Sequence, residues 1–147
     1  MVDREAEGRS DLVLSAVALA DRAALVVLDL QLPAQRGMDL AGELGLATRF
    51  FHSNHEGEFV EHLHGLSELA DGIILNPGAW THYSYAIRDA LELTGLPAVE
   101  IHLSDVDSRE EFRRHSVIAD LCFARVAGQG RDGYREALTR LGAQLSR

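Results

Sequence analysis

The chain has 147 residues, 46% of them hydrophobic and 25% charged, which is the composition of an ordinary globular domain. Its formal net charge of −9 argues against nucleic acid or an anionic membrane as the main partner, because both need a basic surface. The one cysteine, Cys122, excludes an internal disulfide and fits a reducing compartment.

The N-terminal segment is polar and carries no targeting pattern. MVDREAEGRSD lacks the basic start and the unbroken apolar core of a signal peptide. No run approaches the roughly 20 apolar residues of a membrane span. We therefore predict a cytoplasmic protein in which residues 1–147 form a single domain, with 1–9 as a disordered tail.

Apolar patterning predicts helices alternating with strands. Helices are expected over 11–22, 37–44, 56–70, 81–94 and 133–145, and a capping box at 108–111 predicts a further short helix. Strands are expected over 24–30, 48–52, 73–75, 98–103 and 121–127, the last containing Cys122; residues 12–19 also fit a strand. Five strands alternating with helices predict an α/β fold, a flavodoxin-like doubly wound parallel sheet with helices on both faces.

Polar residues follow the predicted strands, where open α/β sheets bind ligands. The second strand leads into Asn54, His55 and Glu56, the third into Asn76 and His82, and the fourth into His102 and Ser104, with Asp89, Arg109 and Arg113 nearby in sequence. Glu100 precedes His102 by two residues and shares its strand face, so it could orient the imidazole. From its position, His102 is a candidate functional residue.

Other chemistries lack their sequence patterns. The histidines include no H-E-x-x-H spacing, and there is neither a G-x-S-x-G elbow nor a phosphate-binding loop. We predict no metal and no cofactor.

Five linked motifs closely resemble type II 3-dehydroquinate dehydratase. They are SNHEGE (53–58), NPGAWTHYS (76–84), RDA (88–90), EIHLS (100–104) and REEFRRHS (109–116), in family order and spacing from about residue 43 to the C-terminus. The resemblance implies elimination of water from 3-dehydroquinate through an enolate, with no cofactor. It also implies trimers that assemble into a dodecamer.

The resemblance assigns roles to individual residues. His102, with Glu100 beside it, matches the general acid that protonates the departing hydroxyl. Asn76, His82, Leu103, Ser104 and Arg113 match substrate-binding positions, and Asp89 matches an acidic residue that reaches a neighbouring subunit's site. A cyclic hydroxy-carboxylate is the implied ligand.

Residues 10–42 depart from the family pattern. The Asn-Gly-Pro-Asn-Leu-Asn motif, the lid Arg and the base Tyr of the family are absent; Asp29 or Ser15 stands at the first Asn, and Arg36 is the one candidate for the lid Arg. Three interpretations stay open: a dehydratase with another base such as Tyr83, an enzyme acting on a related cyclic polyol acid, or a homologue that binds without catalysis.

Overall fold

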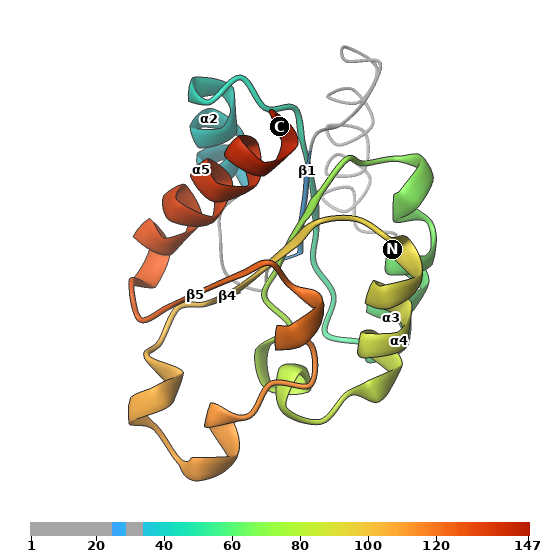
Figure 1. Cartoon of the computed structure of the whole chain (residues 1–147), viewed down its shortest axis with the longest axis vertical. Helices are drawn as coiled ribbons and strands as arrows, with labels where there is room; N and C mark the ends of the chain where they lie inside the picture. The colour runs from blue at the N-terminus through green and yellow to red at the C-terminus, as the bar shows by residue number, and fades with distance from the viewer. Residues whose placement is uncertain (1–24, 29–33) are drawn as a thin grey trace, which may run out of the picture.

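The computed structural model describes residues 25–28 and 34–147 (Figure 1). The predicted tail over 1–9 and the predicted helix over 11–22 lie outside the described residues. Ser15, Asp29 and the side chain of Arg36 lie outside them as well. The first described element of the fold is therefore β1.

The centre of the fold is a parallel sheet. Its strands are β1 (Leu25–Leu28), β2 (Thr48–Phe51), β3 (Ile73–Leu75), β4 (Ala98–His102) and β5 (Ala124–Ala127), in the order β2-β1-β3-β4-β5. All pairs are parallel, which confirms the predicted α/β sheet. Every residue of β3 and β4 is buried, as expected for strands covered on both faces. The strand order reverses between β1 and β3, and ligands bind at such a switch point in open sheets.

Two helix pairs cover the sheet (Figure 1). They are α2 (Ala34–Glu43) with α5 (Gly133–Leu145), and α3 (Glu56–His64) with α4 (Tyr85–Thr94). Each pair has its own apolar core: Val99 and Ile101 pack with α5, whereas Ala98 packs with α3 and α4. Because side chains alternate along a strand, Glu100 and His102 project from β4 on the side of α3 and α4.

Two predicted helix boundaries are wrong: one helix ends early and another starts late. The helix predicted over 56–70 ends at His64, with Gly65 as its C-cap, and a 3-10 turn, Leu66–Glu68, follows. The helix predicted from 81 is divided into a 3-10 turn, Gly78–His82, and α4, because Ser84 Oγ accepts the N–H of Ile87 at 3.1 Å and starts α4 there. On α4, Ile87, Ala90 and Leu91 are buried, whereas Ala86 is exposed.

The predicted capping box at 108–111 is also wrong. The hydroxyl of Ser108 instead donates to the carbonyl of Asp105 at 2.9 Å, and the segment forms two 3-10 turns, Val106–Ser108 and Glu111–Arg114. The last strand begins at Ala124 rather than at 121, because the turn Ala119–Leu121 precedes it.

Cys122 therefore lies before β5, not on it. It packs against the core beneath α4, and its burial raises the pKa of the thiol to about 12. No helix within residues 34–147 has the length and apolar character that crossing a bilayer requires. The cytoplasmic location stays a prediction.

The close packing of Gly72 against α5 provides a stability test. A Cβ at Gly72 would lie 2.8 Å from Cδ1 of Leu141, which is fully buried. We expect Gly72→Ala to lower the free energy of unfolding by about 1–3 kcal/mol through overpacking. Gly57→Ala, with nothing within 4 Å of the new Cβ, is the matched control. Equal stability of the two variants by urea denaturation would contradict the packing argument.

The partly buried ring of His62 predicts a pH-dependent stability. It stacks on Phe51 with centroids 4.0 Å apart, and burial, followed by the charge of Arg49, lowers the pKa of His62 from 6.5 to about 4. Between these two values the unfolded chain binds a proton that the folded chain does not, so stability falls as pH drops from about 6.5 to about 4. Allowing for partial exposure, this contribution is about 1–3 kcal/mol.

We expect His62→Phe to remove this contribution while keeping the stacked ring. Urea denaturation at several pH values between 7.5 and 4 measures it as the difference between the wild-type and variant profiles. His64→Gln, on the exposed side of the same helix, serves as the control and should follow the wild type. Parallel profiles for the wild type and His62→Phe would show that this residue does not carry the effect.

Candidate active site

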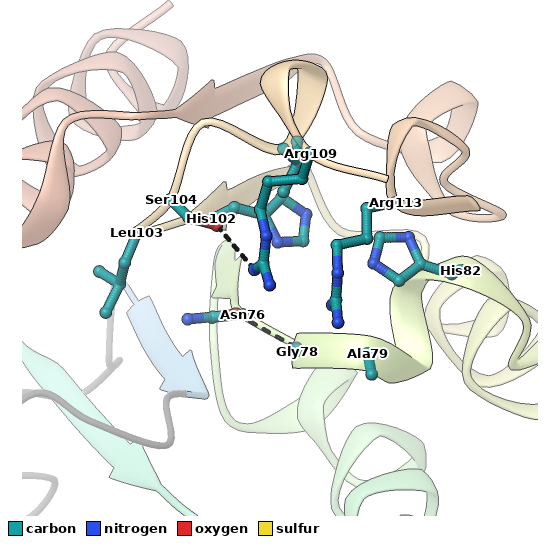
Figure 2. A pocket seen from close by; sticks show the side chains of 10 residues that line it. Asn76, Gly78, Ala79, His82, His102, Leu103, Ser104, Arg109 and Arg113 are labelled. Atoms are coloured by element: carbon teal, nitrogen blue, oxygen red, sulfur yellow. Dashed lines mark hydrogen bonds between the residues drawn. The ribbon is translucent and has the colours of Figure 1, made fainter. Parts of the chain in front are cut away.

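A pocket of about 290 Å³ lies beyond the carboxyl ends of β3 and β4 (Figure 2). Six of the sequence-predicted residues line it: Asn76, His82, His102, Leu103, Ser104 and Arg113. Gly78, Ala79, Val106 and Arg109 complete the lining. The strand ends of β3 and β4 thus meet as the sequence predicts.

The innermost feature of the site is a buried pair formed by Glu100 and His102. Glu100 is fully buried, and its Oε1 lies 2.6 Å from His102 Nε2. The same oxygen accepts the hydroxyl of Thr81 at 2.6 Å, and Oε2 accepts that of Ser116 at 2.9 Å. Burial opposes ionisation of Glu100, but the hydrogen bonds from His102 and Thr81 prevail and hold its pKa below its usual value. The carboxylate therefore fixes Nε2 of His102 as the N–H donor.

His82 presents a second imidazole to the pocket. It ends the turn Gly78–His82, and its ring lies 6.4 Å from that of His102, nearly parallel at 13°. Its Nδ1 lies 2.7 Å from the backbone carbonyl of His115. The edge of the Phe112 ring packs against it, with centroids 5.8 Å apart. A segment distant in sequence, residues 112–115, thus holds His82.

Asn76 is positioned by a backbone turn at the end of β3. Its Oδ1 accepts the N–H of Gly78 at 3.1 Å. Gly78 has a positive φ of 58°, which favours glycine. This turn brings the side-chain amide of Asn76 to the pocket (Figure 2).

Two guanidinium groups extend into the pocket (Figure 2). Arg113 is held by Glu110, Nε to Oε2 at 2.8 Å, and its guanidinium lies over the Phe112 ring, 4.8 Å from the centroid. Arg109 Nη1 lies 3.4 Å from Ser104 Oγ. Guanidinium groups are hydrogen-bond donors, so the two arginines suit a ligand rich in oxygen atoms. The sequence places Arg109 close to the site residues in the chain but assigns it no role.

Sequence reasoning missed Arg125 entirely. It faces Glu100 across the β4–β5 pairing, with Nε 4.0 Å from Glu100 Oε1. Nε and Nη2 are buried and have no hydrogen-bond partner. The sequence shows only that a basic residue lies within an apolar strand. Its position opposite Glu100 follows from the strand register, which the sequence does not give.

The polar cluster predicted at the end of β2 does not join the pocket. β1 separates β2 from β3, so the β2 end lies one strand further away. Asn54 and His55 are exposed, and the carboxylate of Glu56 accepts the hydroxyl of Ser84, which links the start of α3 to the start of α4. Glu56 therefore has a structural role, since it links two helices.

Asp89 and Tyr83 also lie outside the pocket of their own chain. Asp89 is exposed on α4, and Tyr83 is 59% exposed just before that helix. Within the described part of the chain, no group of three or more His, Cys, Asp or Glu side chains is arranged to hold a metal ion.

Comparison with known proteins identifies the family. Residues 29–142 match the model of dehydroquinase class II. The 3-dehydroquinate dehydratase of Pelotomaculum thermopropionicum is 51% identical over 104 residues, which cover 71% of this chain and 72% of the relative. That of Thermotoga petrophila is 56% identical over 88 residues, 60% of each chain.

Solved structures agree with the sequence match. The type II dehydroquinase of Propionibacterium acnes is 31% identical with a TM-score of 0.74, covering 82% of this chain and 97% of that one. The type II dehydroquinase of Butyrivibrio crossotus is 30% identical, also with a TM-score of 0.74, covering 83% and 99%. The present chain therefore belongs to the class II dehydroquinase family.

Proposed function

We infer that this protein is a carbon–oxygen lyase that eliminates water from 3-dehydroquinate to give 3-dehydroshikimate. The observation that carries the inference is the buried Glu100–His102 pair at a pocket in a chain 51% identical to a named 3-dehydroquinate dehydratase. A hydroxyl leaves as water only when a proton reaches it, and this pair is arranged to deliver one.

In the proposed mechanism, His102 is the general acid. The Glu100 carboxylate, 2.6 Å from Nε2, stabilises the imidazolium and orients the ring. Because Nε2 is engaged inward, Nδ1 is the nitrogen that donates its proton to the departing hydroxyl. The C–O bond next to the enolate carbon then breaks, and the carbon–carbon double bond forms. Such an acid contributes roughly 10²–10⁴-fold to the rate.

The substrate is a cyclic hydroxy-carboxylate, which needs several polar partners and a cation. We propose that Ser104 and the backbone of Leu103 hold its carboxylate and that Asn76, His82 and Arg113 contact its hydroxyl groups. The pocket lining supports this assignment, since all five residues face one cavity. Arg109, bonded to Ser104, adds positive charge near the same oxygen atoms.

We also propose that the whole chain forms one flavodoxin-like, doubly wound domain, with residues 10–42 as its divergent N-terminal segment. The strand order β2-β1-β3-β4-β5 supports that topology. Helices on both faces of the sheet support it as well.

The proposed assembly is a homo-oligomer built from trimers, ultimately a dodecamer, in which Asp89 reaches a neighbouring subunit's site. Asp89 lies on α4 between Tyr85 and Leu93, four residues away on either side, so the three share one helix face. Tyr85 is 64% exposed and Leu93 75% exposed. Large apolar side chains flanking an exposed carboxylate fit an interface better than a solvated surface.

Turnover is the direct test of the reaction. Incubating the protein with 3-dehydroquinate should produce the ultraviolet absorbance of a conjugated enone. His102→Ala should reduce kcat by roughly 10²–10⁴-fold with the circular dichroism spectrum retained. His64→Ala, an exposed histidine on α3, is the control and should keep wild-type kcat. Undiminished turnover in His102→Ala would remove His102 from the mechanism.

A wild-type protein that binds 3-dehydroquinate without converting it would instead identify a binding homologue. Ligand-observed NMR, with product formation followed in the same tube, distinguishes the two. Binding without product would refute the lyase assignment and leave the pocket residues as ligand contacts.

Subunit mixing tests the proposed role of Asp89. His102→Ala and Asp89→Ala should each be inactive as pure oligomers. After joint denaturation and refolding, mixed oligomers should regain activity, because some sites receive an intact His102 from one subunit and an intact Asp89 from its neighbour. Light scattering on the same samples measures the assembly. A monomer, or mixtures as inactive as their components, would contradict the shared site.

A further inference from the structure

We propose that His82 is the general base of this pocket, accepting the proton that must leave carbon before the hydroxyl departs. This inference rests on the proposed dehydration and extends it, because it gives His82 a proton-transfer role beyond contact with the substrate. The two imidazoles then divide the chemistry, with His82 taking a proton and His102 giving one.

The pocket lining limits the choice of base. Elimination of water next to a ketone needs one group that removes a proton from carbon and one that protonates oxygen. Among the described residues of the lining, imidazoles are the groups that exchange protons near neutral pH. The others are an amide, a hydroxyl, apolar groups and two guanidinium groups, which stay protonated in proteins. Tyr83, the phenol nearest in sequence, lies outside the lining and is 59% exposed.

A hydrogen bond fixes the tautomer of His82. Its Nδ1 lies 2.7 Å from the carbonyl oxygen of His115, and a carbonyl oxygen only accepts. Nδ1 therefore carries the hydrogen, and in the neutral ring Nε2 has a lone pair. No described residue donates a hydrogen bond to that nitrogen. When Nε2 takes a proton, the His115 carbonyl stabilises the charge that develops on the ring.

The charges around the two rings differ, and the difference separates their roles. His102 contacts the buried carboxylate of Glu100 at 2.6 Å, which favours a cation there. His82 has a neutral carbonyl and the edge of Phe112 as its contacts, and the Arg113 guanidinium lies beside it in the pocket (Figure 2). With ring centroids 6.4 Å apart, two cations would repel each other. These surroundings suit His102 to the role of acid and His82 to the role of base.

The proposed step balances. One carbon lies between the ketone carbon and the carbon that bears the departing hydroxyl. A C–H bond of this carbon breaks, its proton moves to Nε2 of His82, and its electron pair forms the enolate. The enolate electrons then form the carbon–carbon double bond as the C–O bond breaks. His102 supplies the proton that turns the departing hydroxyl into water.

Two substitutions separate catalysis by His82 from substrate binding. Asn and Gln carry amides that can replace Nδ1 and Nε2, respectively, as hydrogen-bonding atoms, but neither amide is a base. We expect His82→Asn and His82→Gln to lose roughly 10²–10⁴-fold in kcat while KM changes by less than about tenfold. Added imidazole should restore part of the turnover of a third variant, His82→Ala.

Solvent exchange isolates the proton-abstraction step. In D₂O, His102→Ala should still incorporate deuterium at the carbon next to the ketone, measured by mass spectrometry of recovered 3-dehydroquinate. The double variant His82→Gln/His102→Ala should show only the enzyme-free exchange rate. Exchange as fast in the double variant as in His102→Ala, or a His82→Gln enzyme with normal kcat and raised KM, would overturn the assignment. A wild type that neither exchanges nor dehydrates would refute the proposed function itself.

Discussion

The structure of this site depends on one buried carboxylate. Glu100 has no exposed surface, so an ionised side chain there is stable only if its oxygens are fully hydrogen-bonded. Its partners come from three places: His102 on the same strand, Thr81 in the turn after β3, and Ser116 in the segment before β5. The backbone of Val117 also donates to Thr81 at 2.8 Å. Hydrogen bonding to the Glu100 carboxylate therefore fixes both the turn that contains Thr81 and the segment that contains Ser116.

The same constraint positions the second imidazole. His82 directly follows Thr81, and the carbonyl that accepts its Nδ1 hydrogen belongs to His115, directly before Ser116. The two loops that hold Glu100 thus also set the orientation of His82. A substitution that disturbed the carboxylate would disturb both rings together. The two imidazoles and the carboxylate of Glu100 therefore form one connected network.

The sequence predicts well where local pattern and tertiary packing agree. The predicted bounds of β3 and α5 match the structure, because β3 is a short apolar run before a polar turn and α5 has an amphipathic pattern that follows a glycine-rich turn. Prediction from sequence fails where a side chain contacts a segment that is distant in the chain. Glu56 follows β2 and resembles a site residue, but it bonds Ser84 on another helix, and no local pattern contains that pairing. Arg125 likewise becomes visible beside Glu100 only once the strand register is known. The ends of the predicted strands already grouped Asn76, His82 and His102, because such ends meet at one edge of a parallel sheet. The motif resemblance added Leu103 and the individual roles.

The departure of residues 10–42 from the family pattern alters where the chemistry must come from. In the family that the sequence resembles, the base belongs to that N-terminal segment, whereas here the described pocket contains two imidazoles whose ring centroids lie 6.4 Å apart. After one turnover, His82 would hold the proton taken from carbon and His102 would lack the one given to oxygen. Because the overall reaction consumes no proton, a single transfer from one ring to the other, through the water just formed or through solvent, restores both. A pocket with this pair needs no further acid or base to complete the reaction. Activity then depends on whether the substrate carbon reaches Nε2 of His82 while the substrate hydroxyl faces His102.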